Sequence, residues 1–320
     1  MVFSARTDLA IEASAMLSRK PGGKIDGVDV ENYEQNGVSV TKVKIIDENG
    51  EAAIGKPVGN YITIECEEIR SGDEEAFKET QAVLTKELKS IAKINDDSVV
   101  LVVGLGNRFV TPDALGPNVT DGLYVTRHLF SEMPDKLSDD LRSVCALSPG
   151  VLGITGIETG EIIQGVAKRV KPNLIIAIDA LASRSMGRIS TTIQLADTGI
   201  TPGSGIGNKR QGINEETLGV PVIAIGVPTV VDAATVANDS IELMMNTINE
   251  NIGSDTDIAK GLAFLNDENR YSLIQQVLYP YVGNLIVTPK EVDSIIEGVS
   301  NVIAESINDA IVSKSGNISG

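Results

Sequence analysis

The sequence predicts an α/β protein with a three-layer α/β/α fold, a mostly parallel central sheet, an N-terminal extension and a C-terminal insertion. Three observations predict it. Short runs rich in Val and Ile, typical of buried strands, alternate with segments in which apolar residues fall at helical spacing. The composition is 42% hydrophobic but only 3% aromatic, which suits a core built on aliphatic side chains. Finally, 320 residues suffice for one large or two modest domains, each with a full core.

Four apolar runs are expected to form the parallel part of the sheet. In chain order they are residues 99–103 (VVLVV), 144–147 (VCAL), 174–178 (LIIAI) and 220–226 (VPVIAIG). The first run ends in a tight turn, Gly104-Leu105-Gly106-Asn107. A shorter strand is expected at 191–195, followed by a long Gly-rich loop through residue 212. A loop of that length inside a compact domain is usually functional.

Helices are expected between and after these strands. Pro112 suits a first helical turn, and Pro172 ends the helix before it. The expected helices are residues 112–130, 161–170, 229–252 and 289–311. In the first 98 residues the pattern indicates strands at 38–46 and 60–65 and a helix at 74–94. The predicted organisation is a propeptide at 1–8, an extension packed on the core at 9–98, and a core at 99–320. The core contains an insertion near 253–285, of which residues 271–281 are part.

Charge and cysteine content restrict the possible partners. The chain has 27 Lys and Arg against 44 Asp and Glu, a net charge of -17, so its mean field repels nucleic acid and anionic membranes. We find neither a basic, apolar leader nor an 18-residue apolar run, which predicts a cytoplasmic protein without a membrane span. Cys66 and Cys145 lack neighbours at metal-ligand spacing, and we expect both to be reduced thiols in the core.

Two aspartates are the candidate catalytic residues. Asp113 follows the strand at 99–103 through one loop, and Asp179 ends the strand at 174–178. The carboxyl ends of parallel strands meet at one edge of a sheet, so both carboxylates should open onto the same crevice. There one could act as general base on a water and the other as general acid. The alternative is that Asp113 is a helix N-cap or an acid of the first turn after Pro112, and that Asp179 caps the following turn.

Three other motifs are weaker candidates for a functional site. His128, the single histidine, lies about four helical turns beyond Asp113, too far for a Ser-His-Asp or Cys-His arrangement. Asp197-Thr198-Gly199 spells the pepsin-like signature, but in one copy, so we interpret it as a coincidental tripeptide or a turn that lines the site. The turn at 104–107 begins like a dinucleotide fingerprint, yet Phe109 stands at the third glycine position.

Four stretches resemble the germination proteases, endopeptidases of endospore-forming bacteria. They are residues 102–117 (VVGLGNRFVTPDALGP), 146–159 (ALSPGVLGITGIET), 175–210 (IIAIDALASRSMGRISTTIQLADTGITPGSGIGNKR) and 219–233 (GVPVIAIGVPTVVDA), and the resemblance covers essentially the whole chain. It implies degradation of the small acid-soluble proteins that coat spore DNA. The family's two proposed catalytic aspartates fall in motifs that match TPDALGP and AIDALAS, hence Asp113 and Asp179.

The resemblance also implies a precursor that removes its own N-terminal segment. The target pattern, an acid before an apolar residue with Ala after it, matches residues 7–13 (TDLAIEA) and places the cut between Asp8 and Leu9. An acid before the scissile bond requires a cationic subsite. The candidates are the basic residues of the loops near Asp179: Arg184, Arg188, Lys209 and Arg210. The resemblance further implies a homo-oligomer, a tetramer, in the cytoplasm of the spore core, with no direct contact to nucleic acid or membrane.

The turn and its acids also resemble hydrogenase-maturation peptidases, whose acidic pair binds metal together with a histidine. No histidine follows Asp179 here, so we predict neither a metal nor a cofactor. Two other functions stay open at this point. One is a dinucleotide-binding oxidoreductase that uses the Gly-rich turns. The other is a spore protein that binds the coat proteins without cutting them.

Overall fold

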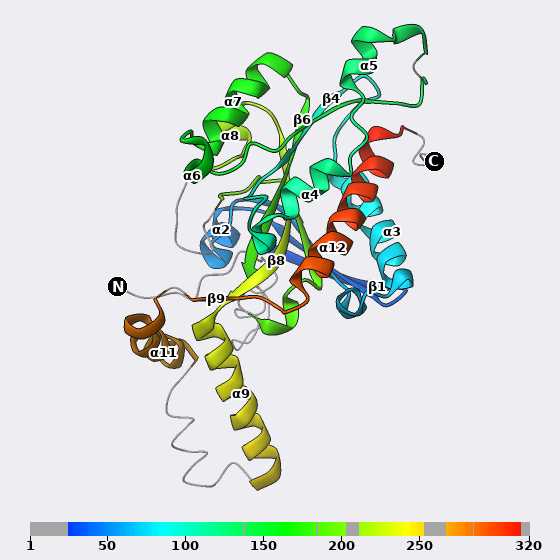
Figure 1. Cartoon of the computed structure of the whole chain (residues 1–320). Coiled ribbons are helices and arrows are strands. Elements are labelled where there is room, and N and C mark those ends of the chain that lie inside the picture. The colour runs from blue at the N-terminus through cyan, green and yellow to red at the C-terminus, as the bar shows by residue number, and fades with distance from the viewer. Residues whose placement is uncertain are drawn as a thin grey trace.

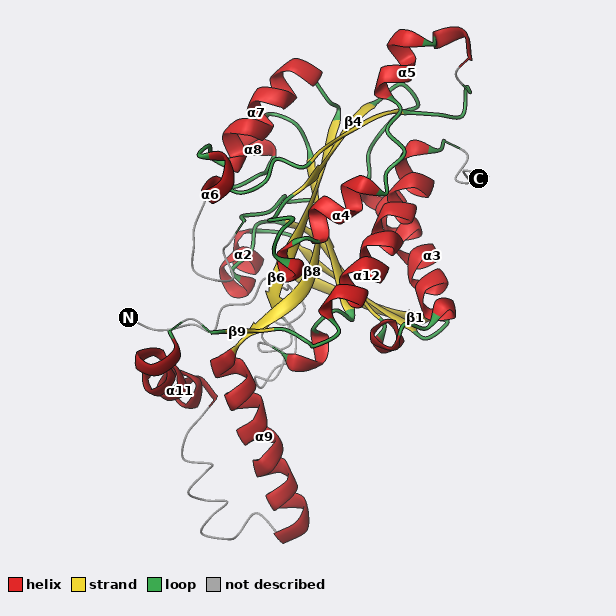
Figure 2. Ribbon diagram, in the orientation of Figure 1, coloured by secondary structure: helices red, strands yellow, loops and turns green. Residues whose placement is uncertain are grey.

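The computed structural model describes residues 25–136, 138–183, 185–202, 211–252, 267–283 and 285–314. Within them, nine strands form one sheet with helices on both faces, so the predicted α/β class is confirmed (Figures 1 and 2). The strands are β1 (Val28–Gln35), β2 (Val38–Ile45), β3 (Gly59–Glu65), β4 (Val99–Gly104), β5 (Ser143–Leu147), β6 (Leu174–Ser183), β7 (Thr192–Ala196), β8 (Val222–Asp232) and β9 (Ile286–Val287).

The sheet is mixed, in the order β1-β2-β3-β7-β8-β6-β4-β5, with β9 paired to β8. The four strands predicted from apolar runs, β5, β4, β6 and β8, are parallel to one another. From β8 outward, β7, β3, β2 and β1 pair antiparallel, which joins the N-terminal residues to the same sheet. The strands expected at 38–46 and 60–65 are β2 and β3.

Strand β1 was missed because its residues VDVENYEQ are mostly exposed and polar, as expected for an edge strand. The sequence did contain a local indication of the hairpin that β1 forms with β2. Asn36 and Gly37 connect β1 to β2 with φ of 50° and 80°, the left-handed pair of a type I′ hairpin turn.

The described helices lie against the two faces of the sheet or project from it. They are α2 (Glu48–Ile54), α3 (Glu74–Ile91), α4 (Leu115–Asp121), α5 (Arg127–Glu132), α6 (Leu152–Thr155), α7 (Thr159–Val170), α8 (Glu215–Leu218), α9 (Ala233–Ile252), α11 (Asp267–Val282) and α12 (Val292–Ile307). Helices α3, α4 and α12 pack with one side of β4, through Val100 and Val102. Helix α7 packs with the other, through Leu101 and Val103. Helices α9 and α11 pack together and project from the sheet (Figure 1).

The prediction of a single helix at 112–130 is wrong. The chain instead forms a short 3₁₀ turn, η2 (Thr111–Asp113), then α4, a break, and α5. At the break, Asn308 after α12 is fully buried; its Oδ1 accepts from Tyr124 N at 3.0 Å and its Nδ2 donates to Gly122 O at 3.1 Å. These two bonds replace helical ones, so a tertiary contact overrides the local periodicity.

The helix expected from residue 229 begins later, at Ala233. Residues 229–232 continue β8, which pairs with β6 as far as Val231. The β-branched Thr229, Val230 and Val231 suit a strand better than a helix. Asp232 then provides the helix start, since its Oδ1 accepts from Ala234 N at 2.6 Å.

No helix among the described residues combines the length and apolarity needed to cross a membrane.

Candidate active site

The turn after β4 lies against the segment that carries Asp113. Gly106 has φ of 111°, and a Cβ there would stand 2.0 Å from the backbone oxygen of Asp113. Glycine is therefore required for this approach. From the same turn, Asn107 N donates to Asp113 Oδ2 at 2.8 Å. The carboxylate is thus held by the turn, outside the helix that follows, so it does not act as an N-cap of α4.

Asp179 lies beside the same turn. Leu105 N donates to Ile178 O at 2.8 Å, which brings the residue after Ile178 next to the turn. The Asp179 side chain is 7% exposed, and its Oδ1 accepts from Ala180 N at 3.0 Å. The sequence pattern ended the strand at 178, whereas β6 continues to Ser183. Asp179 therefore lies within a strand and not at its end.

The 3₁₀ turn η2, which carries Asp113, lies against the strand that carries Asp179. It contacts both β6 and β8, the neighbouring parallel strands. Pro112 O accepts from Thr229 Oγ1 at 2.7 Å, so β8 holds the residue that precedes Asp113. Both candidate aspartates therefore belong to one cluster of elements: the turn after β4, η2, and the middle of β6 and β8.

A buried polar row extends from Asp179 across the sheet. Gly226 on β8 is the partner of both Asp179 on β6 and Gln194 on β7, and Gln194 is the partner of Thr63 on β3. Side chains at paired positions share a face of the sheet. Gln194 and Thr63 are 7% and 0% exposed. Sequence reasoning missed both, although a polar residue inside the apolar strand TIQLA was a signal.

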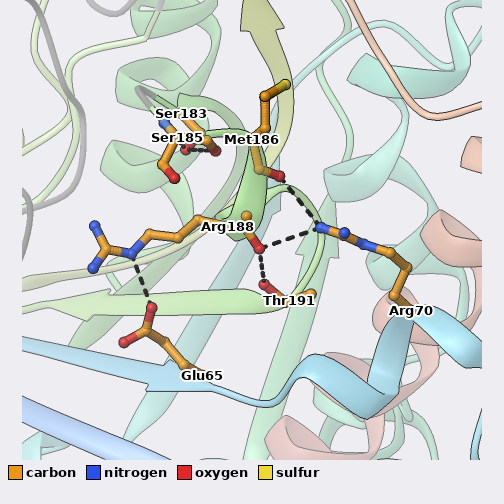
Figure 3. A network of polar contacts seen from close by, with 8 residues as sticks. Glu65, Arg70, Ser183, Ser185, Met186, Arg188 and Thr191 are labelled. Carbon is orange, nitrogen blue, oxygen red and sulfur yellow. Dashed lines mark hydrogen bonds and ion pairs between the residues drawn. The ribbon is translucent and has the colours of Figure 1, made fainter. Parts of the chain in front are cut away.

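Of the four basic candidates, Arg188 falls in the described chain, on the loop between β6 and β7, and Arg184, Lys209 and Arg210 lie outside it. Arg188 Nε donates to Glu65 Oε1 at 2.9 Å, which joins the loop to β3 (Figure 3). Arg70 holds the same loop by donating to Ile189 O at 2.7 Å and Gly187 O at 3.3 Å. The processing pair, Asp8 and Leu9, also lies outside the described residues.

Comparison with known proteins identifies the family. A family model described as Germination protease matches residues 5–265 and 258–317. A germination protease from Caldanaerobacter subterraneus subsp. tengcongensis is 51% identical over 97% of this chain and 95% of its own. Those of Clostridium tetani and Bacillus cereus are 48% and 43% identical over 97% of this chain, and over 96% and 94% of their own. The chain belongs to the germination protease family. Its activity is therefore that of a protease.

The histidine and the two cysteines of this germination protease do not lie in surroundings that activate a nucleophile. His128 is exposed on α5, which packs near β5. Burial raises the pKa of the thiols of Cys66 and Cys145, so both stay protonated at neutral pH. Neither thiol is therefore suited to nucleophilic attack.

The Asp197-Thr198-Gly199 tripeptide has a structural role in this germination protease. Asp197 Oδ1 accepts from Asn60 N at 2.8 Å and its Oδ2 from Asn60 Nδ2 at 2.6 Å, which fastens the end of β7 to β3. Thr198 Oγ1 donates to Tyr61 Oη at 3.1 Å. Burial raises the pKa of Tyr61 to about 12, so its neutral hydroxyl donates to Pro57 O at 2.8 Å.

The Gly-rich turn also has an explanation other than dinucleotide binding. Gly104 and Gly106 are needed for close approach to Gly116 and Asp113 within the chain itself. In the described residues no group of three or more His, Cys, Asp and Glu side chains could hold a metal ion.

Proposed function

We propose that this protease is an aspartate-dependent endopeptidase in which Asp113 and Asp179 activate a water. One aspartate, as the carboxylate, accepts a proton from the water as the water attacks the peptide carbonyl. The other, as the protonated carboxylic acid, gives its proton to the departing nitrogen as the C–N bond breaks. The observation that supports the proposal is that the Gly104–Asn107 turn binds the carboxylate of Asp113 and also the backbone carbonyl of Ile178, the residue before Asp179.

The substrates in this proposal are the small acid-soluble proteins of the spore core, which the protein degrades at germination. It acts on these proteins in the cytoplasm of the spore and does not bind the DNA or a membrane. The proposal includes a homo-oligomer, a tetramer by family resemblance, and a precursor that removes its own residues 1–8.

The test of this proposal is the maturation of the purified precursor. Incubated under mildly acidic conditions of low water activity, it should lose residues 1–8 and show a new N-terminus at Leu9 by mass spectrometry. Asp8→Lys should slow the step because it places a positive charge against a basic subsite. Asp113→Asn should stop it when no active enzyme is added. Continued cleavage of highly purified Asp113→Asn would assign the cut to another protease or another residue.

Within this proposal Arg188 receives the acidic side chain that precedes the scissile bond. Glu65 engages its Nε, and a guanidinium carries five N–H donors, so one arginine can serve both carboxylates. We expect Arg188→Gln to reduce the preference for Glu over Gln at that position about tenfold, the value of one charge-assisted hydrogen bond. Competition between two matched peptides, quantified by mass spectrometry, measures the ratio.

Arg70→Gln is the matched control for Arg188. Arg70 donates to two backbone carbonyls of the same loop, Gly187 O and Ile189 O. Loss of these hydrogen bonds should make the loop less well held, which should lower the turnover of both peptides equally. If Arg188→Gln also left the Glu-to-Gln ratio at the wild-type value, Arg188 would have no part in the subsite.

A further inference from the structure

Strand β8 contains an extra residue next to the proposed catalytic site. The register between β6 and β8 pairs Leu181 with Pro228 and Ala182 with Val230, so Thr229 has no partner on β6. This is a β-bulge. Proline has no N–H to donate to the ladder, and inside a sheet it is confined to edges, strand starts and bulges. Pro228 in the middle of a central strand therefore accounts for the position of the irregularity.

The bulge directs three polar groups away from the ladder. Thr229 Oγ1 donates to Pro112 O at 2.7 Å, and Thr229 O accepts from Thr288 Oγ1 at 2.9 Å. Pro228 O accepts from Ser190 N at 2.7 Å, and Ser190 has a left-handed φ of 60°. The bulge is thus bonded to η2, to the segment that leads into β7, and to the residue after β9.

The bond to Pro112 acts on the backbone of Asp113. Pro112 O belongs to the peptide group that links Pro112 to Asp113, so Thr229 restrains that group from the side of β8. From the other side, Asn107 N restrains the carboxylate itself. Thr229 is 1% exposed, so water does not compete for its hydroxyl. A carboxylate restrained both through its backbone and at Oδ2 keeps one orientation.

We infer that Thr229 is a positioning residue for the proteolytic reaction: the bulge aims its hydroxyl at Pro112 O and so sets the orientation of Asp113. It touches neither water nor substrate and acts through Asp113 alone. The inference rests on the proposed function, since it takes Asp113 as catalytic. Misplacement of a reacting group by about 1 Å can lower a rate a hundredfold, which is the scale on which such a restraint acts.

The experiment compares two substitutions at position 229 in steady-state cleavage of a peptide with the sequence of residues 4–16. Thr229→Val keeps the shape and removes the hydroxyl, and we expect kcat to fall about tenfold to a hundredfold with KM unchanged. Thr229→Ser restores the hydroxyl, and kcat should return to within about threefold of wild type. Equal kcat values for the two variants, or a rise in KM alone, would overturn the inference.

A control and a background variant exclude a purely structural effect. Thr120 Oγ1 also donates to a proline carbonyl, Pro117 O, at 2.7 Å, but within α4, so Thr120→Val should leave kcat at the wild-type value. In protein that already carries Asp113→Asn, Thr229→Val should lower the residual kcat no further, because the two residues act as one unit. An additive loss in the double variant contradicts positioning through Asp113.

The same measurements distinguish a failure of the proposed function from a failure of the role assigned to Thr229. If Asp113→Asn cleaves the peptide at the wild-type rate, the proposed function fails. If Asp113→Asn is inactive but Thr229→Val cleaves like wild type, the proposed function stands and the role of Thr229 is disproved.

Discussion

Asp179→Asn is expected to lower kcat by about 10³-fold or more while the protein stays folded. An amide can neither accept a proton from water nor deliver one to a leaving nitrogen. The fold should survive because an asparagine oxygen can still accept the hydrogen bond that Ala180 N donates to Asp179 Oδ1. Asp113→Asn should behave alike, since its amide oxygen can accept from Asn107 N.

Peptide digestion followed by mass spectrometry, with circular dichroism on the same samples, measures both effects. Asp121→Asn is the matched control. That carboxylate lies at the end of α4 in an exposed ion pair with Arg108, so its loss should leave kcat unchanged. Wild-type turnover by folded Asp179→Asn or Asp113→Asn would remove that aspartate from the mechanism.

Gly104→Ala is expected to destabilise the protein by about 3 kcal/mol, the upper range for an overpacked core. A Cβ at Gly104 would stand 2.1 Å from Gly116 O and 2.4 Å from Gly116 C, both rigid backbone atoms. Strand β4 and helix α4 must therefore separate. Because η2 leads directly into α4, Asp113 moves with the helix, and kcat should fall about a hundredfold.

Urea unfolding and steady-state kinetics on one preparation test this. Gly165→Ala is the control, because Gly165 is exposed within α7 and a Cβ there meets no atom within 4 Å. That substitution should stabilise the protein by about 1 kcal/mol through helix propensity and leave turnover intact. A Gly104→Ala protein as stable and active as wild type would contradict the close approach of β4 and α4.

The local sequence pattern was sufficient to predict the strands at the core of the fold. The Val- and Ile-rich runs predicted β4, β6 and β8, because a strand buried on both faces is apolar at every position. The short apolar run at 144–147 predicted β5, an edge strand that is mostly half-buried. The same reasoning placed the two aspartates after the ends of such strands, whereas β6 in fact continues past Asp179. Alternation of polar and apolar residues predicted β2, and the sequence pattern also indicated β3.

Prediction from the local sequence pattern failed where a contact with a distant segment overrides the helical spacing of the apolar residues. Apolar spacing continued through residues 122–126, yet Asn308 breaks the helix there, from a position 186 residues beyond Gly122. The prediction of a helix directly after Pro228 is also wrong, although a proline within an apolar run is itself an indication of a bulge.

By itself, the sequence determined the α/β class, the parallel strands, the candidate aspartates and, through its motifs, the family. Tertiary structure alone decided how β4 approaches α4, which carboxylate pairs with Arg188, and that β8 restrains the peptide before Asp113. The physical reason is that these features are contacts between segments far apart in the chain: Glu65 and Arg188 are 123 residues apart, and Pro112 and Thr229 are 117 apart. Hydrophobic periodicity reports which side of an element is buried, but it does not report what that side is buried against.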